Sequence, residues 1–186
     1  MRKYNPPIGR PLRDSKQHRF SIPNEVWDHK LKPIGFMIFS YLCYCQSHNH
    51  LSNLALEMIA NSVHTTTNTA KKYIESLISR GLITSEWSLA PSSQCNSYKN
   101  FFTLPNEIFL LKLQPSAFMV YAYLLLIEDR KTHTCHPSYN TIATATGMSK
   151  NTALKSISVL LETGLIAAEP SRYFDRHGMK WKGNNL

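Results

Sequence analysis

An internal repeat constrains the fold of this chain more than any other feature of its sequence. Residues 20–42 return 82 positions later as residues 102–124, with 11 of 23 positions identical. At a shift of 83, residues 56–83 match residues 139–166 at 11 of 28 positions. Such self-similarity is typical of a tandem duplication. The sequence therefore predicts two related units of roughly 80 residues, each large enough to fold as a small domain.

Both units predict the same succession of three helices. A proline, Pro33 or Pro115, starts the first helix, because its missing N–H costs nothing at that position. Aromatic residues of this helix are interpreted as core or inter-domain packing. A serine, Ser52 or Ser138, is the predicted N-cap of a short second helix. The predicted second helices span residues 53–61 and 139–145.

The third helix of each unit has apolar residues at helical spacing and a hydroxyl residue as its predicted N-cap, Thr66 or Ser149. A glycine ends each helix in the left-handed conformation. Gly147 makes a tight turn before this helix in the second unit, and His64 takes its place in the first unit. The predicted core residues are Ala70, Ile74 and Leu77 in the first unit and Ala153, Ile157 and Leu160 in the second; the terminal glycines are Gly81 and Gly164.

A β-hairpin is predicted after each third helix. Residues 82–87 are expected to pair with residues 98–103, and residues 165–174 with residues 179–182 across a tight turn. The second return strand runs into the end of the chain at Leu186. This position favours either a very short last strand or a longer product of which the chain is a part.

Three helices followed by a hairpin make a winged helix-turn-helix. The predicted fold class is α+β and mainly α, with two tandem winged helix-turn-helix domains, each of three helices plus a small antiparallel β-hairpin wing. The predicted domains are residues 20–101 and 102–186. A flexible basic arm, residues 1–19, precedes them.

The second unit carries a specific motif. From His136 it reads His-Pro-Ser-Tyr-x-x-Ile-Ala-x-x-x-Gly-Met-Ser-Lys-Asn-Thr, and it closes with Leu-x-x-x-Gly-Leu-Ile. This motif resembles the bacterial helix-turn-helix domains of phage, plasmid and conjugative-element proteins. The first unit departs from it at His64 and lacks Pro-Ser before the second helix. The resemblance implies DNA binding, in a replication initiator or a transcriptional regulator, and does not choose between the two.

The net charge of +9 is concentrated at the two ends of the chain. Residues 1–19 carry six cations and one anion, and residues 172–186 carry four cations and one anion. Residues 20–171 are nearly neutral, with 11 cations and 10 anions. Basic flanks beside a neutral body favour a polyanionic partner. The alternative is a protein with a loose basic tail.

The exposed face of each third helix is the predicted contact with DNA bases and phosphates. A helix-turn-helix places the start of this helix in the major groove. Asn can pair with adenine, Lys can reach guanine or phosphate, and Thr can contact phosphate or a thymine methyl. An ordinary solvated face, with Asn and Thr serving as caps, is the alternative. The candidates are Thr67, Asn68, Thr69, Lys71 and Lys72 in the first unit and Ser149, Lys150, Asn151, Thr152 and Lys155 in the second.

Cations of the second wing and of the arm are predicted to contact the DNA backbone or the minor groove. The arm contains prolines that prevent a helix, so a disordered tail is its alternative role. The first wing is nearly uncharged, and the second domain is therefore expected to dominate binding. The candidates are Arg172, Arg176, Lys180 and Lys182 in the wing and Arg10, Arg13 and Arg19 in the arm.

Signatures of an enzyme, a metal site or a membrane protein are missing from the sequence. It has no glycine-rich phosphate loop, acid pair or nucleophile elbow. Cys43 and Cys45 lie two positions apart on a predicted helix and point about 200° apart, so both cannot face one metal ion. The apolar stretches are too short to span a bilayer, and no secretory signal is present, which favours the cytoplasm. No catalytic residue, metal, cofactor or small-molecule substrate is predicted.

Together these features predict a protein that binds double-stranded DNA in a sequence-dependent way. Its two units are expected to read adjacent half-sites, in replication initiation of a plasmid or mobile element. Transcriptional regulation of such an element is the first alternative. A winged-helix scaffold for protein partners is the second, although a scaffold has no need of basic flanks. Replication proteins and self-association remain open as further partners.

Overall fold

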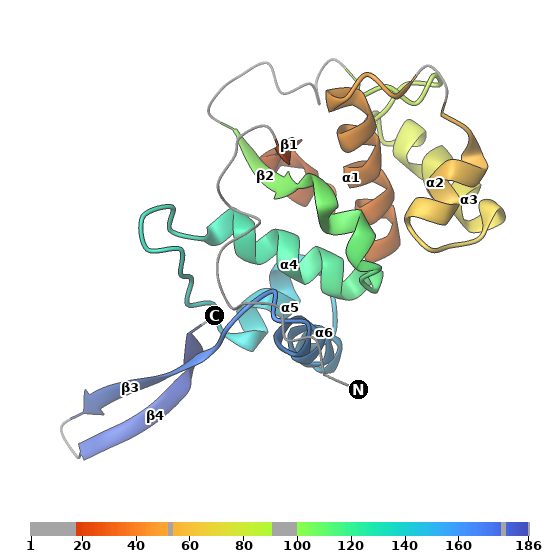
Figure 1. Cartoon of the computed structure of the whole chain (residues 1–186). Helices are drawn as coiled ribbons and strands as arrows, with labels where there is room; N and C mark the ends of the chain where they lie inside the picture. Colours follow the sequence, from red (N-terminus) through yellow and green to blue (C-terminus); the bar gives the residue numbers. More distant parts are fainter. Residues whose placement is uncertain (1–17, 52–53, 91–99, 176–177, 186) are drawn as a thin grey trace, which may run out of the picture.

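Each repeat folds into three α-helices preceded by a short strand and a 3-10 helix (Figure 1). The computed structural model describes residues 18–51, 54–90, 100–175 and 178–185. The first unit contains β1 (Arg19–Pro23), η2 (Asn24–Trp27), α1 (Pro33–Ser47), α2 (Leu56–Ser62) and α3 (Thr67–Ser79). The second contains β2 (Phe101–Pro105), η5 (Asn106–Leu111), α4 (Pro115–Ile127), α5 (Tyr139–Thr146), α6 (Lys150–Glu162), β3 (Glu169–Asp175) and β4 (Gly178–Asn185).

The helices begin where the sequence predicts, with one exception. Pro33 and Pro115 occupy the first turn of α1 and α4. Side-chain oxygens of Thr66, Ser138 and Ser149 accept hydrogen bonds from backbone N–H groups at the starts of α3, α5 and α6. The exception is α2, which begins at Leu56 after an N-cap, Ala55, that makes no side-chain bond. The prediction of Ser52 as this cap is therefore wrong, and Ser52 itself lies outside the described residues.

The turn before the third helix has the same backbone conformation in both units. Gly147 has φ = 65°, and His64, its equivalent, has φ = 53°. An L-residue in this left-handed region costs roughly 1–2 kcal/mol, whereas glycine adopts it freely. The fold thus imposes one geometry on two different residues.

We expect Gly147→Ala to lower the free energy of unfolding by about 1–2 kcal/mol and His64→Gly to raise it by up to about 1 kcal/mol. No atom lies within 4 Å of a Cβ built on Gly147, so the cost there arises from the backbone and not from a clash. Urea denaturation of the two variants measures both changes. Shifts of the same sign would contradict the backbone explanation.

The first predicted wing is wrong. Residues 101–103 do not pair with residues 82–87; they belong to β2, whose partner is β1. Beyond α3, Ile83 forms an isolated bridge to Leu89 around a turn, and residues 91–99 lie outside the described part of the chain. The alternating apolar residues of β2 are buried against the strand that precedes α1, and this long-range pairing replaces the local hairpin.

The second wing is confirmed, with a longer return strand than expected. β3 and β4 pair antiparallel, with Tyr173 opposite Lys180 and Phe174 opposite Met179. β4 spans Gly178–Asn185, so the expectation of a very short last strand is wrong. In Figure 1 the hairpin extends away from the body of helices.

An approximate two-fold axis relates the two units. In the β1–β2 sheet, Ser21 lies opposite Thr103, its equivalent in the other unit. Phe20 pairs with Leu104 and Ile22 pairs with Phe102, and exchanging the units converts one pair into the other. Reciprocal pairing of this kind is the rule at the interface of a symmetric dimer. Two covalently linked copies therefore pack here as the subunits of a dimer do.

Aromatic rings continue the symmetric contact between α1 and α4. Phe36 contacts Phe118, its equivalent, with ring centroids 6.1 Å apart. Two further ring pairs exchange under the same axis: Trp27 with Tyr123 at 5.6 Å, and Tyr41 with Phe109 at 5.1 Å. The interpretation of these aromatic residues as packing is confirmed, and the buried apolar residues of both units form one continuous core.

Candidate nucleic-acid interface

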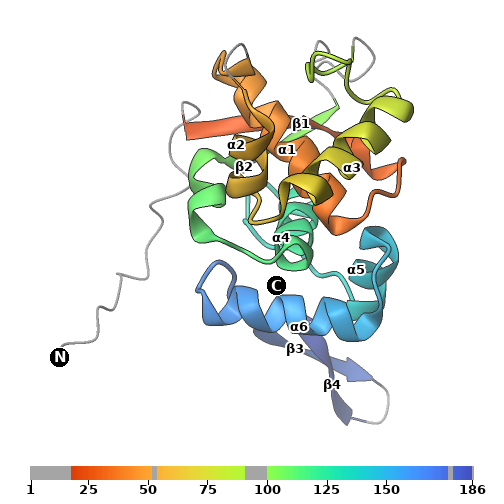
Figure 2. The same ribbon diagram turned by 90° about the vertical axis from the view of Figure 1, so that its right-hand side faces the viewer.

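Each third helix packs one face on the first helix of its own unit. α3 lies on α1 and α6 lies on α4. Both views place α3 and α6 on opposite sides of the central α1–α4 pair (Figures 1 and 2). The predicted core residues of both helices, Ala70, Ile74, Leu77, Ala153, Ile157 and Leu160, are at most 3% exposed. The opposite face of each helix is free of the core.

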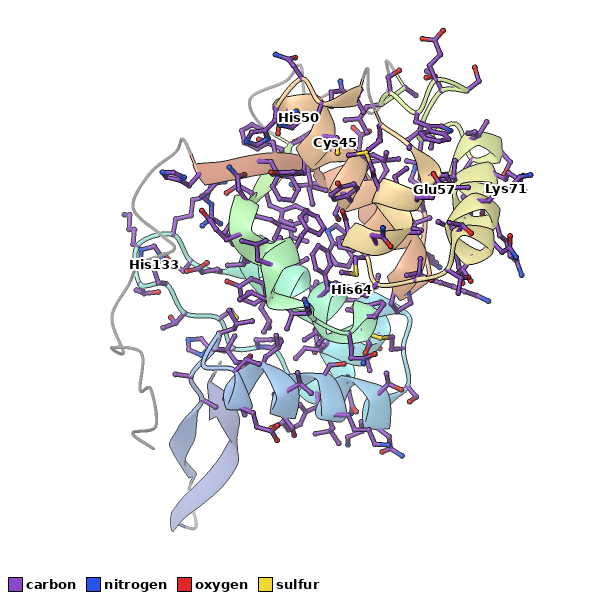
Figure 3. The ribbon with its side chains drawn as sticks, turned by 45° about the vertical axis from the view of Figure 1, so that its right-hand side comes forward. Cys45, His50, Glu57, His64, Lys71 and His133 are labelled. Atoms are coloured by element: carbon purple, nitrogen blue, oxygen red, sulfur yellow. The ribbon has the colours of Figure 1, made fainter. Side chains whose placement is uncertain are left out.

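The predicted contact residues lie on this outer face. Lys71 and Lys72 of α3 and Lys150 and Lys155 of α6 are exposed, and Figure 3 shows Lys71 on the outer side of α3. Thr67, Asn68 and Asn151 also belong to the first turn of these helices; the two asparagines are exposed and Thr67 is half-buried. Within the described part of the chain, the side-chain amides of Asn68 and Asn151 have no hydrogen-bond partner.

Hydroxyl groups at the starts of α3 and α6 are engaged in capping. In α6, the Thr152 backbone N–H donates to Ser149 Oγ over 3.2 Å, and the two hydroxyls are 2.9 Å apart. Thr69 makes the same two contacts with Thr66 at 3.2 and 2.9 Å. The alternative role of these threonines, helix capping, is therefore present in the structure. Asn68, Asn151 and the lysines remain the side chains that are free to reach a ligand.

The predicted cations outside the two helices are placed less completely. Arg10, Arg13 and Arg176 lie outside the described residues, as do the side chains of Arg172, Lys180 and Lys182. Arg19 is the first residue of β1 and not part of the arm. Its guanidinium donates to the side-chain and backbone oxygens of Thr103, at 2.8 and 2.7 Å, which ties β1 to β2.

Sequence reasoning missed two cations that the fold brings beside α3. Lys32 precedes α1 and Arg80 follows α3, and together with Lys72 they line one pocket of about 180 Å³. The second unit has Gln114 and Thr163 at the equivalent positions. This difference between otherwise similar repeats is the signal that could have identified them.

Metal-binding side chains do not converge in the part of the chain that the structure describes. The described residues contain no group of three His, Cys, Asp or Glu side chains that could hold a metal ion. Figure 3 shows His133 on a loop of the second unit, well apart from Cys45 and His50 in the first. Burial also raises the pKa of the Cys45 and Cys135 thiols to about 11, so both are protonated at neutral pH and poor metal ligands.

We expect these two thiols to make stability depend on alkaline pH. Folding raises their pKa from about 9 to about 11, so the neutral form is favoured in the native state. The stabilisation is complete below pH 9 and is lost as the pH rises towards 11. The free energy of unfolding, measured by urea denaturation between pH 8 and 11, should fall less steeply in a Cys45→Ala/Cys135→Ala variant. Parallel pH profiles would contradict the expectation.

The structure also bears on membrane insertion. Among the described residues, no helix is long enough and apolar enough to cross a bilayer.

Comparison with known proteins identifies one part of the chain. No curated protein and no solved structure matches it. The family described as helix-turn-helix domain matches residues 111–166, which run from the end of η5 through α4, α5 and α6. The match does not extend over the first unit or over the hairpin of β3 and β4. The second unit thus contains a helix-turn-helix domain, which suggests DNA binding.

Proposed function

We propose that the chain binds double-stranded DNA in a sequence-dependent way through both units, with α3 and α6 as recognition helices. The observation that carries this proposal is the recurrence of one exposed polar face. Asn-Thr-Ala-x-Lys occurs at the start of α3 and again at the start of α6, each time after a hydroxyl cap. Exposed Asn and Lys at a helix start are the residues that read bases and neutralise phosphates in the major groove.

The approximate two-fold axis supports a proposal about the kind of DNA site. Dimeric helix-turn-helix proteins read inverted half-sites about 10 base pairs apart, because operator symmetry mirrors protein symmetry. By the same argument, α3 and α6 read two half-sites in inverted orientation. The two faces have diverged, with Lys150 in α6 where α3 has Thr67. The two half-sites therefore need not be identical.

A mobility shift with random duplex DNA at low salt tests the proposal first. We expect retarded complexes whose affinity falls with salt, since each neutralised phosphate releases counterions. Selection of bound sequences from a random duplex library then gives the target. Absence of any shift at low salt would leave the protein-binding scaffold as the better function.

Asn151→Ala separates base reading from capping. The amide of Asn151 is exposed at the start of α6, and the cap of this helix is formed by Ser149 instead. We expect the variant to lose about 1–3 kcal/mol of binding free energy on the selected site and little on random DNA. Equal losses on both DNAs, measured by fluorescence anisotropy, would reduce Asn151 to a structural role.

The process we propose is replication initiation of a plasmid or mobile element, with transcriptional regulation of such an element as the alternative. The resemblance of the second unit to domains of phage, plasmid and conjugative-element proteins supports both. The selected sequence distinguishes them. Tandem copies of the target in a replication origin would favour initiation, and a single copy overlapping a promoter would favour regulation.

A further inference from the structure

A basic pocket opens between the start of α1 and the second half of α3. Its volume of about 180 Å³ exceeds by more than tenfold the roughly 10–15 Å³ that a single water needs. Lys32, Lys72 and Arg80 line it, and the lining residues that the structure describes include no acidic side chain. Three positive charges in a lining without a carboxylate make an anion the favoured occupant.

One wall of the pocket depends on a glycine. A Cβ built on Gly35 would lie 3.1 Å from Cδ1 of Tyr73, so the tyrosine ring rests directly on the first turn of α1. The second unit has Ala117 and Ser156 at these positions, and both are buried. The close approach of the ring to the backbone is therefore a property of the first unit. The close approach and the two additional cations, Lys32 and Arg80, therefore occur together in the first unit, and the second unit has neither.

The chemistry of these cations suits a group with several oxygen atoms. Arg80 donates from Nη1 to the carbonyl oxygen of His29 over 2.7 Å, which anchors the guanidinium and leaves its other N–H groups available. Guanidinium groups match phosphate oxygens with two parallel hydrogen bonds, and ammonium groups add point charges. Gly35 also lines the pocket, in the first turn of α1, where backbone N–H groups lack intrahelical partners.

The pocket is continuous with the proposed DNA-reading face. Lys72 belongs to both, since it lies on the outer side of α3 and lines the pocket. We propose that this pocket binds a phosphate group of the DNA backbone beside α3. This inference rests on the proposed function and deepens it: the first unit holds the duplex by a phosphate contact that the second unit does not make at the equivalent place.

The test removes the two cations that distinguish the units. Lys32→Gln/Arg80→Thr installs the residues of the second unit, and both side chains are exposed, so the fold should be retained. The matched control is Arg130→Thr/Lys131→Gln, which removes the same charges from an exposed loop of the second unit. Binding to random duplex is measured across a salt series. We expect the pocket variant to lose about tenfold in affinity at 0.1 M salt and about one unit of salt slope, with the control close to wild type.

Small molecules that carry phosphate groups offer the pocket the same chemistry as the DNA backbone. A second measurement distinguishes these two kinds of ligand. Calorimetric titration of the DNA-free protein with inorganic phosphate and with ATP should give no binding below the millimolar range. Should Arg80→Thr impair folding, Lys32→Gln alone keeps the salt-slope test.

The outcomes separate this inference from the function on which it rests. Wild-type protein that fails to bind duplex overturns both. Wild-type protein that binds, with pocket and control variants losing equally, overturns the phosphate contact alone. Tight binding of phosphate or ATP, with an unchanged salt slope in the pocket variant, overturns it in favour of a small-molecule site.

Discussion

Replacing Phe36 with alanine is expected to lower the free energy of unfolding by about 3–5 kcal/mol, the usual cost of removing a buried phenylalanine ring. Phe36 is fully buried in α1. The centroid of its ring lies 4.8 Å from that of Trp27 and 6.1 Å from that of Phe118 in the other unit. The loss thus removes packing within the first unit and across the symmetric contact. Because both units share one core, unfolding in urea should remain a single transition.

Leu110→Ala is the control for this measurement. Leu110 is 77% exposed in η5, so the variant removes an apolar side chain that contributes little burial and should change stability by less than about 0.5 kcal/mol. Phe118→Ala should resemble Phe36→Ala, since the two rings are equivalent across the axis. A loss below 1 kcal/mol for both phenylalanine variants, or two separate transitions in the wild type, would contradict a shared core.

The double variant Lys150→Ala/Lys155→Ala is expected to bind random duplex DNA roughly 100-fold more weakly at 50 mM salt, with a salt slope about two units flatter. Lys150 is the first residue of α6, at the end of the helix that we propose enters the groove. The first unit has Thr67 at this position and carries its additional lysine, Lys71, further along the helix.

Lys71→Ala/Lys72→Ala is the matched variant. Lys72 and Lys155 are equivalent, so the comparison isolates Lys150 against Lys71. We expect the α3 variant to lose about one slope unit and about tenfold in affinity, because Lys71 lies further from the start of α3, the end that we propose enters the groove. All four lysines are exposed, and circular dichroism should show an unchanged fold for both variants. Equal losses would refute the predicted dominance of the second unit.

Local chemistry alone determined most of the helices. Pro33 and Pro115 begin α1 and α4, and Thr66, Ser138 and Ser149 cap the helices that follow them, as their positions in the sequence indicate. The core residues of α3 and α6 were predictable for the same reason, since a spacing of three to four residues places them on one face. These features depend on residues within one or two turns of each other.

Candidate DNA-contact residues were predictable from the sequence only where they lie on the helix face opposite the core residues. When the predicted core positions of α6 are set aside, Lys150, Asn151 and Lys155 are left as the residues expected at the surface. All three are exposed in the structure. Lys32 and Arg80 could not be found in this way. They lie 48 positions apart, and only the packing of α1 on α3 places them around one pocket.

The sequence by itself determined that the chain is duplicated and that each copy contains three helices, because self-similarity, caps and apolar spacing are local properties of the chain. Only the tertiary structure decided how the copies join. The alternating strand at Phe102 and Leu104 is compatible with a hairpin to residues 82–87 or with pairing to β1. The strand pairs with β1 because this pairing buries its apolar side chains: it places Phe102 and Leu104 opposite Ile22 and Phe20 in the shared core. Pairing energy depends on which partner completes the core, and no local pattern encodes that choice.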